Sequence, residues 1–255
     1  MHARHDGRFL KGKPISLMVL DYGLFKVHAD GRIIGICGFL LRTDQNEAVL
    51  IDTGFPKHYA IDAQAASAAD DLGKFGEVLR LTQENLPAGQ LALAGLAISD
   101  IDLLILTHSH IDHIGGLDDL PGAPVLLARA ERDLPRPLYF GGHRPMEWPD
   151  RAYLTIDADT LIGPGFQALP SPGHAPGQLA FCVDLPHTGW VLLTSDAISR
   201  PAEVDEKFDT APNPAQACTS AARLLAIAGQ RNAMIIYGHC PVQWPRLKKA
   251  PYVYD

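Results

Sequence analysis

Thr107-His108-Ser109-His110-Ile111-Asp112-His113-Ile114-Gly115-Gly116 is the most informative segment of this chain. It places three imidazoles and one carboxylate within six positions, directly after the mainly apolar run 101–106. Imidazole nitrogens and carboxylate oxygens together suit zinc or a neighbouring first-row divalent ion. A buried strand that ends in such donors predicts a metal site on a rigid scaffold, rather than a polar surface loop.

The spacing of the motif indicates how its donors are arranged. In a strand-like backbone His108 and His110 point to the same side, so both can reach one ion. Asp112 and His113 follow where the chain must turn. The motif therefore predicts a compact group of four donors at the end of a strand.

Length and composition describe an ordinary globular protein. The 255 residues are enough to bury a substantial core, and apolar and charged contents of 47% and 20% are typical of the class. The net charge of -7 disfavours a broad nucleic-acid or anionic-membrane footprint. No apolar run approaches the roughly 20 residues needed to span a bilayer. We therefore expect neither nucleic acid nor a membrane as a partner.

The N-terminus indicates a cytoplasmic protein, and the cysteines form no recognisable motif. Residues 1–7 lack the apolar segment of a secretory signal, so a cytoplasmic location follows by default. The four cysteines stand singly, which excludes a Cys-x-x-Cys redox or zinc motif. We expect one hydrolase domain over residues 1–255, in which residues 1–14 form a solvated N-terminal tail.

Short strand-like runs recur along the chain, each bounded by Gly, Pro, Asp or Asn. They are residues 15–20, 33–41, 48–51, 103–106, 125–127, 166–169, 179–183, 190–193 and 234–237. A helix is predicted from Asn213 as N-cap and Pro214 as first residue to about Gly229. The segment 61–96 has no strand signal and reads as one or two helices. This order suggests layered sheets covered by helices, although periodicity leaves other α/β arrangements open.

Three further donors follow strands or tight turns. His174 lies within the Pro- and Gly-rich stretch 169–177, Asp196 ends the apolar run 191–196, and His239 ends the run 234–239. Each of these positions alone is explained by a turn histidine or a capping carboxylate. Together they repeat one arrangement, in which a stiff strand presents a donor at its end. That repetition favours a shared site.

With the upstream Val49-Leu50-Ile51-Asp52-Thr53-Gly54, these motifs resemble the metallo-β-lactamase superfamily over roughly residues 15–245. The resemblance implies an α/β fold, the αββα four-layer sandwich, with mixed sheets inside and helices on the outer faces. It implies two divalent metal ions, with Asp52 orienting their ligands. One ion would be held by His108, His110 and His174, the other by Asp112, His113 and His239, with Asp196 as the bridge.

Within the superfamily the chain most resembles the N-acyl-homoserine lactonases, through residues 169–177, 191–197 and 237–239. Asp196 argues against the thiolate-using β-lactamases, and the short segment after His239 argues against glyoxalase II enzymes and flavodoxin-fused relatives. One position departs from the lactonase pattern: Ser199 stands where those enzymes usually carry a tyrosine that polarises the lactone carbonyl. The sequence leaves open whether Tyr22, Tyr139 or Tyr237 takes its place.

The expected function is a metal-dependent hydrolase that opens the ring of N-acyl-homoserine lactones or related lactones. Attack would come from a metal-bridging hydroxide, and Asp112 or Asp196 would pass a proton to the leaving oxygen. The substitution at Ser199 keeps a phosphotriester or other ester hydrolase open as the alternative. A non-enzymatic binding module is disfavoured because every ligand position is filled. Zinc is the expected metal, with cobalt, manganese and iron left open. The expected partner is a small lactone or ester, and the oligomeric state is left open, a homodimer included.

Overall fold

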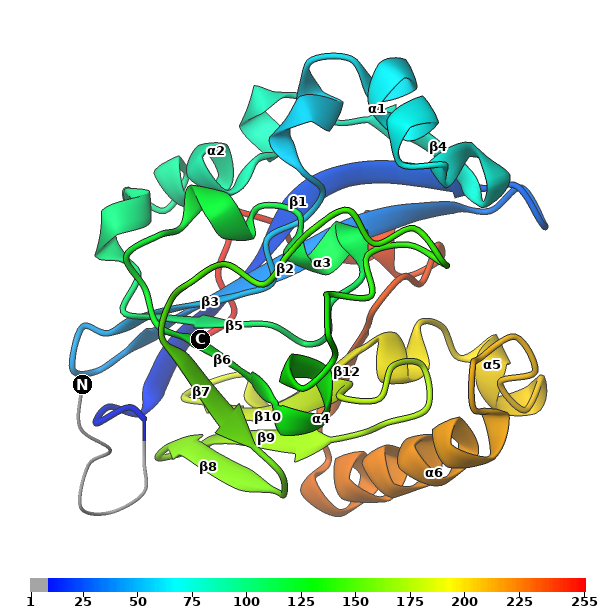
Figure 1. Cartoon of the computed structure of the whole chain (residues 1–255). Helices are drawn as coiled ribbons and strands as arrows, with labels where there is room; N and C mark the ends of the chain where they lie inside the picture. The colour runs from blue at the N-terminus through cyan, green and yellow to red at the C-terminus, as the bar shows by residue number, and fades with distance from the viewer. Residues whose placement is uncertain (1–8) are drawn as a thin grey trace.

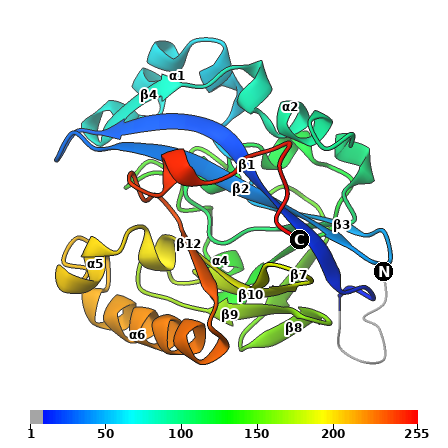
Figure 2. The same ribbon diagram turned by 180° about the vertical axis from the view of Figure 1, so that it is seen from behind.

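Two β-sheets lie face to face between two layers of helices in the computed structural model, which describes residues 9–255 (Figures 1 and 2). Helices α1 (Ala63–Ala69) and α2 (Pro87–Ala92) lie on the outer side of one sheet. Helices α5 (Ala202–Asp205) and α6 (Pro214–Arg231) lie on the outer side of the other. The predicted αββα sandwich is therefore confirmed.

The larger sheet has seven strands and the smaller has five. In spatial order the seven are β4 (Gly76–Arg80), β1 (Pro14–Val27), β2 (Ile33–Thr43), β3 (Ala48–Ile51), β5 (Leu103–Ile105), β6 (Val125–Ala128) and β7 (Tyr153–Ile156). The five are β12 (Met234–Tyr237), β11 (Gly189–Ser195), β10 (Leu179–Leu185), β9 (Phe166–Pro170) and β8 (Thr160–Gly163). Both sheets are mixed: β3, β5, β6 and β7 run parallel, as do β11 and β12, and the other pairs are antiparallel.

The remaining helices are short and lie in connections. They are α3 (Ile111–Ile114), α4 (Arg129–Arg132) and the 3-10 turns η1 (Lys57–Ala60), η2 (Leu72–Lys74), η3 (Gln83–Asn85), η4 (Ile98–Asp100), η5 (Leu117–Asp119), η6 (Asp196–Ile198) and η7 (Trp244–Arg246). Helix α6 begins as predicted, because the Asn213 side chain accepts a hydrogen bond from Gln216 N–H and Pro214 follows it. It continues two residues past Gly229 and ends at Asn232, whose left-handed backbone stops the helix.

Alternation along the strands divides the core into three layers. Leu50 faces the helices above the larger sheet, whereas its neighbour Ile51 faces the space between the sheets. Leu193 likewise points between the sheets, and Leu192 points toward α6. All four side chains are fully buried. Both sheets are covered on both faces, which fixes strand register and hence where each strand ends.

Every strand predicted from the sequence is present, but the prediction of helices alone over residues 61–96 was wrong. That segment contains β4, a strand at the edge of the sheet that pairs with β1. Its solvent-exposed residues carry no apolar alternation, so only the neighbouring strand identifies it. Strands β7 and β8 were missed for a similar reason, since both are four-residue strands with mixed burial.

The expected N-terminal tail is only partly described. Residues 1–8 of it lie outside the described residues. Phe9 and Leu10 depart from the prediction, because the N–H groups of both donate hydrogen bonds to the carbonyl of Ile162, and Leu10 is buried between the sheets. In the described part of the chain, no helix is long and apolar enough to cross a membrane.

Candidate metal centre

The predicted donors meet because the strands that carry them end at one edge of the sandwich. Strands β3 and β5 run parallel with Ile51 opposite Ile105, so Asp52 and the histidine motif emerge side by side. Strands β11 and β12 run parallel with Ser195 opposite Tyr237, which brings Asp196 close to residue 239. Carboxyl ends of parallel neighbours lie at the same sheet edge, where ligand sites form in α/β proteins.

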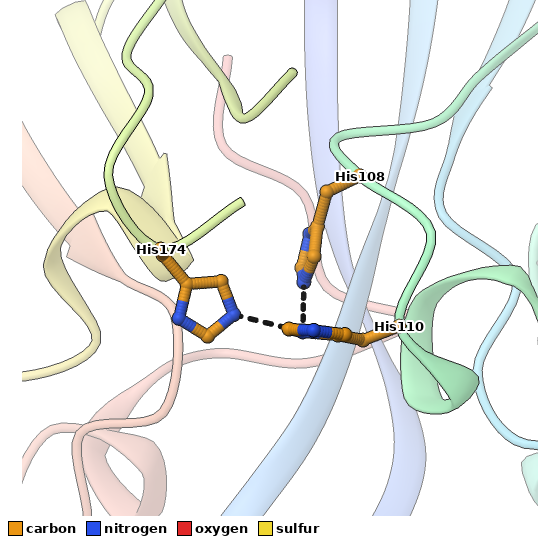
Figure 3. Close-up of side chains that lie close together, drawn as sticks. All are labelled: His108, His110 and His174. Atoms are coloured by element: carbon orange, nitrogen blue, oxygen red, sulfur yellow. Dashed lines mark hydrogen bonds between the residues drawn. The ribbon is translucent and has the colours of Figure 1, made fainter. Parts of the chain in front are cut away.

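Three histidines form the first cluster (Figure 3). The Nε2 atom of His108 lies 3.0 Å from Nδ1 of His110, and Nε2 of His174 lies 2.9 Å from the same atom. Figure 3 shows the rings of His108 and His174 both directed at the ring of His110. Two of these residues come from the loop after β5, and His174 comes from the loop between β9 and β10 of the other sheet.

Asp112, His113 and His239 form the second cluster. Oδ2 of Asp112 lies 3.5 Å from Nε2 of His113 and 3.4 Å from Nε2 of His239. Asp196 lies between the two clusters. Its Oδ2 is 3.4 Å from Nε2 of His174, and its Oδ1 is 3.2 Å from Nε2 of His239. The two oxygens of one carboxylate thus face different clusters, as expected of a bridging ligand.

Asp52 holds two of the imidazoles in place from behind. It is fully buried and accepts hydrogen bonds from Nδ1 of His113, from the Thr107 hydroxyl and from the Thr107 backbone N–H, each at 2.8 Å. Because the hydroxyl of Thr107 donates to Asp52, it can accept from Nδ1 of His108, 3.0 Å away. In its neutral form, each ring therefore presents an unprotonated Nε2 to the cluster.

His239 is oriented in the same way by the backbone of β2. Its Nδ1 donates a hydrogen bond of 3.0 Å to the carbonyl oxygen of Gly35. That bond leaves Nε2 of His239 free to face Asp112 and Asp196. The sequence motifs gave no sign of the Gly35 contact, because strand β2 lies distant in sequence and contributes only a main-chain atom.

The electrostatics divide the histidines into two groups. Burial and the neighbouring imidazoles lower the pKa of His108 well below its usual value and that of His110 to about 3. Burial also opposes a charge on His113, but the carboxylates of Asp112, Asp196 and Asp52 outweigh it and raise the pKa of His113. The same balance, dominated by Asp196 among the carboxylates, raises the pKa of His239 to about 9. The three-histidine cluster is therefore neutral, whereas the second cluster attracts positive charge.

The donors fit a divalent cation. In the described part of the chain, His113 Nε2 and Asp196 Oδ1 are buried without a hydrogen-bond partner, and both point into the cluster. Buried polar atoms are rarely left unpaired, so these two atoms indicate a ligand. Zinc–nitrogen bonds of about 2.0–2.1 Å place tetrahedral donors about 3.3 Å apart, close to the spacing of the histidine nitrogens.

Of the three candidate tyrosines for the group missing at Ser199, two have hydroxyls that are hydrogen-bonded elsewhere, and the third packs on the outer side of the smaller sheet. The hydroxyl of Tyr22 donates to the carbonyl oxygen of Asp52, and that of Tyr139 donates to Asp70. Tyr237 packs in the cluster beneath α6, on the outer side of the smaller sheet. Within residues 9–255, none of the three hydroxyls is hydrogen-bonded to one of the seven donor side chains.

Two residues that the sequence did not single out belong to the same region. Thr107 begins the motif, and its hydroxyl links Asp52 to His108. Glu131 is a buried carboxylate that contacts the loops of both sheets. Thr107 could have been found from its place beside the first histidine, whereas no sequence signal identifies Glu131.

Comparisons with known proteins agree with this architecture. The sequence model of the metallo-beta-lactamase superfamily matches residues 38–239. N-acyl homoserine lactonase AiiA of Bacillus thuringiensis subsp. kurstaki is 29% identical over 211 residues, covering 79% of each chain. N-acyl homoserine lactonase AttM of Azorhizobium caulinodans is 30% identical over 186 residues, covering 65% of this chain and 68% of its own length.

Solved structures show the same fold. An N-acyl homoserine lactone hydrolase with N-hexanoyl-L-homoserine bound at its catalytic metal centre superposes with a TM-score of 0.82 at 23% identity, covering 96% of this chain and all of its own. The dizinc quorum-quenching lactonase AidC superposes with a TM-score of 0.65 at 17% identity, covering 96% of both chains. By its sequence match and its fold, this chain belongs to the metallo-beta-lactamase superfamily.

Proposed function

We propose that this protein is a dinuclear metal-dependent hydrolase that opens the lactone ring of N-acyl-homoserine lactones. The observation that carries the proposal is the position of Asp196, whose two oxygens face two separate clusters of donors. The sequence relatives named N-acyl homoserine lactonase support the substrate class. The proposed ligands are those expected from the sequence: His108, His110 and His174 for one ion, Asp112, His113 and His239 for the other, and Asp196 for both.

Zinc is the metal that we propose for both positions, because neutral imidazole and carboxylate are ligands that it prefers. Two such ions would lower the pKa of water toward about 7 and polarise the carbonyl oxygen of the lactone. Asp52, Thr107 and the Gly35 carbonyl contribute by fixing the protonated nitrogen of each ring they contact. A fixed tautomer keeps the other nitrogen of each ring available as a ligand.

Asp112 is the candidate for moving the proton of the reaction. Its carboxylate is more exposed than that of Asp196, 18% against 8% of the side chain. Burial opposes its charge, but His113 and His239 lower the pKa of Asp112 to about 2, so the carboxylate is ionised at neutral pH. In this role Asp112 takes the proton of the attacking water and passes it to the alkoxide oxygen that leaves when the ring opens.

Phosphotriester hydrolysis on the same site is the second candidate, and Ser199 is the observation that favours it. The backbone N–H of Ser199 donates to Glu203 at 2.7 Å, and its carbonyl accepts from His239 N–H at 2.9 Å. These contacts hold the Ser199 backbone next to His239, one of the proposed metal ligands. The serine side chain is too short to place its hydroxyl where a tyrosine hydroxyl would lie. A substrate without a lactone carbonyl has less need of that hydroxyl.

Parallel turnover assays distinguish the two candidates. Zinc-loaded protein is assayed with hexanoyl-, decanoyl- and dodecanoyl-homoserine lactone and with paraoxon. We expect ring opening of the lactones, a loss of at least about 100-fold in His110→Ala, and no loss in His28→Ala, an exposed histidine in the turn after β1. Slow lactone opening beside rapid paraoxon cleavage would replace the first proposal by the second. Turnover that survives in His110→Ala would contradict both.

The setting of the activity is part of the proposal. We infer one hydrolase domain over residues 1–255 that acts in the cytoplasm on a small lactone or ester. Supporting the location, Cys37, Cys182, Cys218 and Cys240 form no disulfide in the described chain, as is usual in reducing compartments. Sedimentation of the zinc-loaded protein would test whether it is a monomer or a homodimer.

A further inference from the structure

Glu131 is a buried carboxylate for which the proposed chemistry has no role. It lies on helix α4, directly after strand β6, and its exposed fraction is 0%. It is no member of the donor clusters found among residues 9–255. A fully buried carboxylate is costly unless its oxygens are satisfied, so its retention needs a structural reason.

Three hydrogen bonds satisfy Glu131, and they come from two different loops. Oε1 accepts from the backbone N–H of Ser109 at 2.9 Å and from its hydroxyl at 2.5 Å. Oε2 accepts from the backbone N–H of Gly177 at 3.0 Å. Ser109 stands between His108 and His110, and Gly177 is three residues after His174.

The two loops belong to different sheets, and among the described residues no strand pairing joins them. One backbone hydrogen bond, from Leu179 N–H to the Thr107 carbonyl at 2.8 Å, connects their bases, whereas Glu131 connects Ser109 to Gly177 nearer to the histidines. The loop of Ser109 follows β5 of the larger sheet, whereas Gly177 lies between β9 and β10 of the smaller sheet. Gly177 also packs closely on α4, since a Cβ on it would lie 2.4 Å from Cβ of Glu131. Glu131 therefore acts as a clamp: through its hydrogen bonds it connects the loop of His108 and His110 to the loop of His174.

The pattern of donors requires an ionised carboxylate at this position. The Ser109 hydroxyl accepts a hydrogen bond from Leu138 N–H at 2.9 Å, so its own proton is directed to Glu131. Burial raises the pKa of Glu131, while the donors on Ser109 and Gly177 work in the opposite direction. A glutamine amide has one oxygen and one donating nitrogen. In either orientation, the amide nitrogen of a glutamine would face a backbone N–H group, that of Ser109 or that of Gly177, and no hydrogen bond could form there.

We propose that Glu131 is a positioning residue, which holds the loop of His108 and His110 and the loop of His174 at the separation that one metal ion requires. The inference rests on the ligand assignment of the proposed function. It predicts an effect confined to the three-histidine position. The other position is built on α3, Asp196 and the end of β12, which Glu131 does not contact through hydrogen bonds.

The test is a zinc titration of Glu131→Gln against a chromophoric chelator. We expect the wild-type protein to bind two ions and the variant to lose about tenfold or more in affinity for one of them. In a His174→Ala background Glu131→Gln should change nothing further, whereas in His239→Ala its effect should persist. Ser109→Ala, which removes one bond of the clamp without an opposing donor, should weaken the same ion less.

Glu47→Gln is the matched control. The Glu47 carboxylate also accepts from two backbone N–H groups and one hydroxyl, those of Lys11, Gly12 and Thr43, in a part of the fold distant in sequence from the donors. Zinc affinities in Glu131→Gln equal to wild type, or lowered equally at both positions, would overturn the inference. If Glu131→Gln does not fold, an unchanged zinc titration of Ser109→Ala would overturn it instead. A wild-type protein that binds no zinc would overturn the ligand assignment as well.

Discussion

Replacing Asp52 by asparagine tests how the ligands are oriented. The carboxylate has three donors at 2.8 Å, of which two share Oδ2 and one uses Oδ1. Asparagine keeps the shape but has only one accepting atom. If its nitrogen faces His113, the imidazole must give up its Nδ1 proton and carry it on Nε2, where it blocks metal binding. If its nitrogen faces Thr107, two N–H groups oppose each other inside the core.

The size of the effect follows from these contacts. A hydrogen bond to a charged group contributes about 1.5–3 kcal/mol, and an unpaired buried donor costs about 1–3 kcal/mol. We therefore expect the free energy of unfolding of metal-free Asp52→Asn to fall by about 2–4 kcal/mol. Loss of an orienting carboxylate lowers metal affinity by about 10–100-fold. Here that loss should fall on the ion held by Asp112, His113 and His239.

Urea unfolding with chelator present measures the first quantity, and zinc titration with a competing chelator measures the second. Asp102→Asn serves as the control, because its carboxylate lies at the opposite end of the neighbouring strand and accepts one hydrogen bond, from Ala48 N–H at 2.8 Å. Wild-type stability together with wild-type zinc affinity in Asp52→Asn would refute the reasoning. So would an equal change in Asp102→Asn.

Three further outcomes are expected. The metal-free protein should lose stability as the pH rises from about 6.5 to about 9, because His239 binds a proton in the folded state that it has released in the unfolded state; urea midpoints that stay level or rise across this range would contradict this. Phe181→Ala should lower the free energy of unfolding by about 3–5 kcal/mol, since Phe181 is fully buried between the sheets. Urea unfolding measures this loss, and a wild-type unfolding midpoint in the variant would contradict the prediction. Gly35→Ala should lower the free energy of unfolding by about 1–3 kcal/mol, because the new Cβ would lie 2.0 Å from the Trp244 ring. It should also weaken zinc binding at His239, because the carbonyl of residue 35 orients that histidine. An unchanged unfolding curve and zinc titration would show that the Trp244 ring moves aside without cost.

The strands that carry the donors, and most of the layered fold, could be predicted from the amino-acid sequence. Runs such as Val49–Ile51 and Val191–Leu193 are apolar at every position, because both faces of each sheet are covered. Such runs, bounded by turn residues, identify strands without knowledge of their neighbours. Donor side chains directly after these runs then predict a metal site, because pairing within the sheet fixes the position of each strand end.

The groups that surround those donors could not be predicted in this way, because they depend on contacts between distant parts of the chain. The edge strand β4 exists because β1 pairs with it, and its own residues carry no pattern that requires a strand. The carbonyl of Gly35 and the carboxylate of Glu131 meet the site across long separations in sequence, through contacts that local periodicity does not encode. Side-chain chemistry next to a strand is a local property, whereas the hydrogen-bond partner of a buried group depends on how the sheets are stacked.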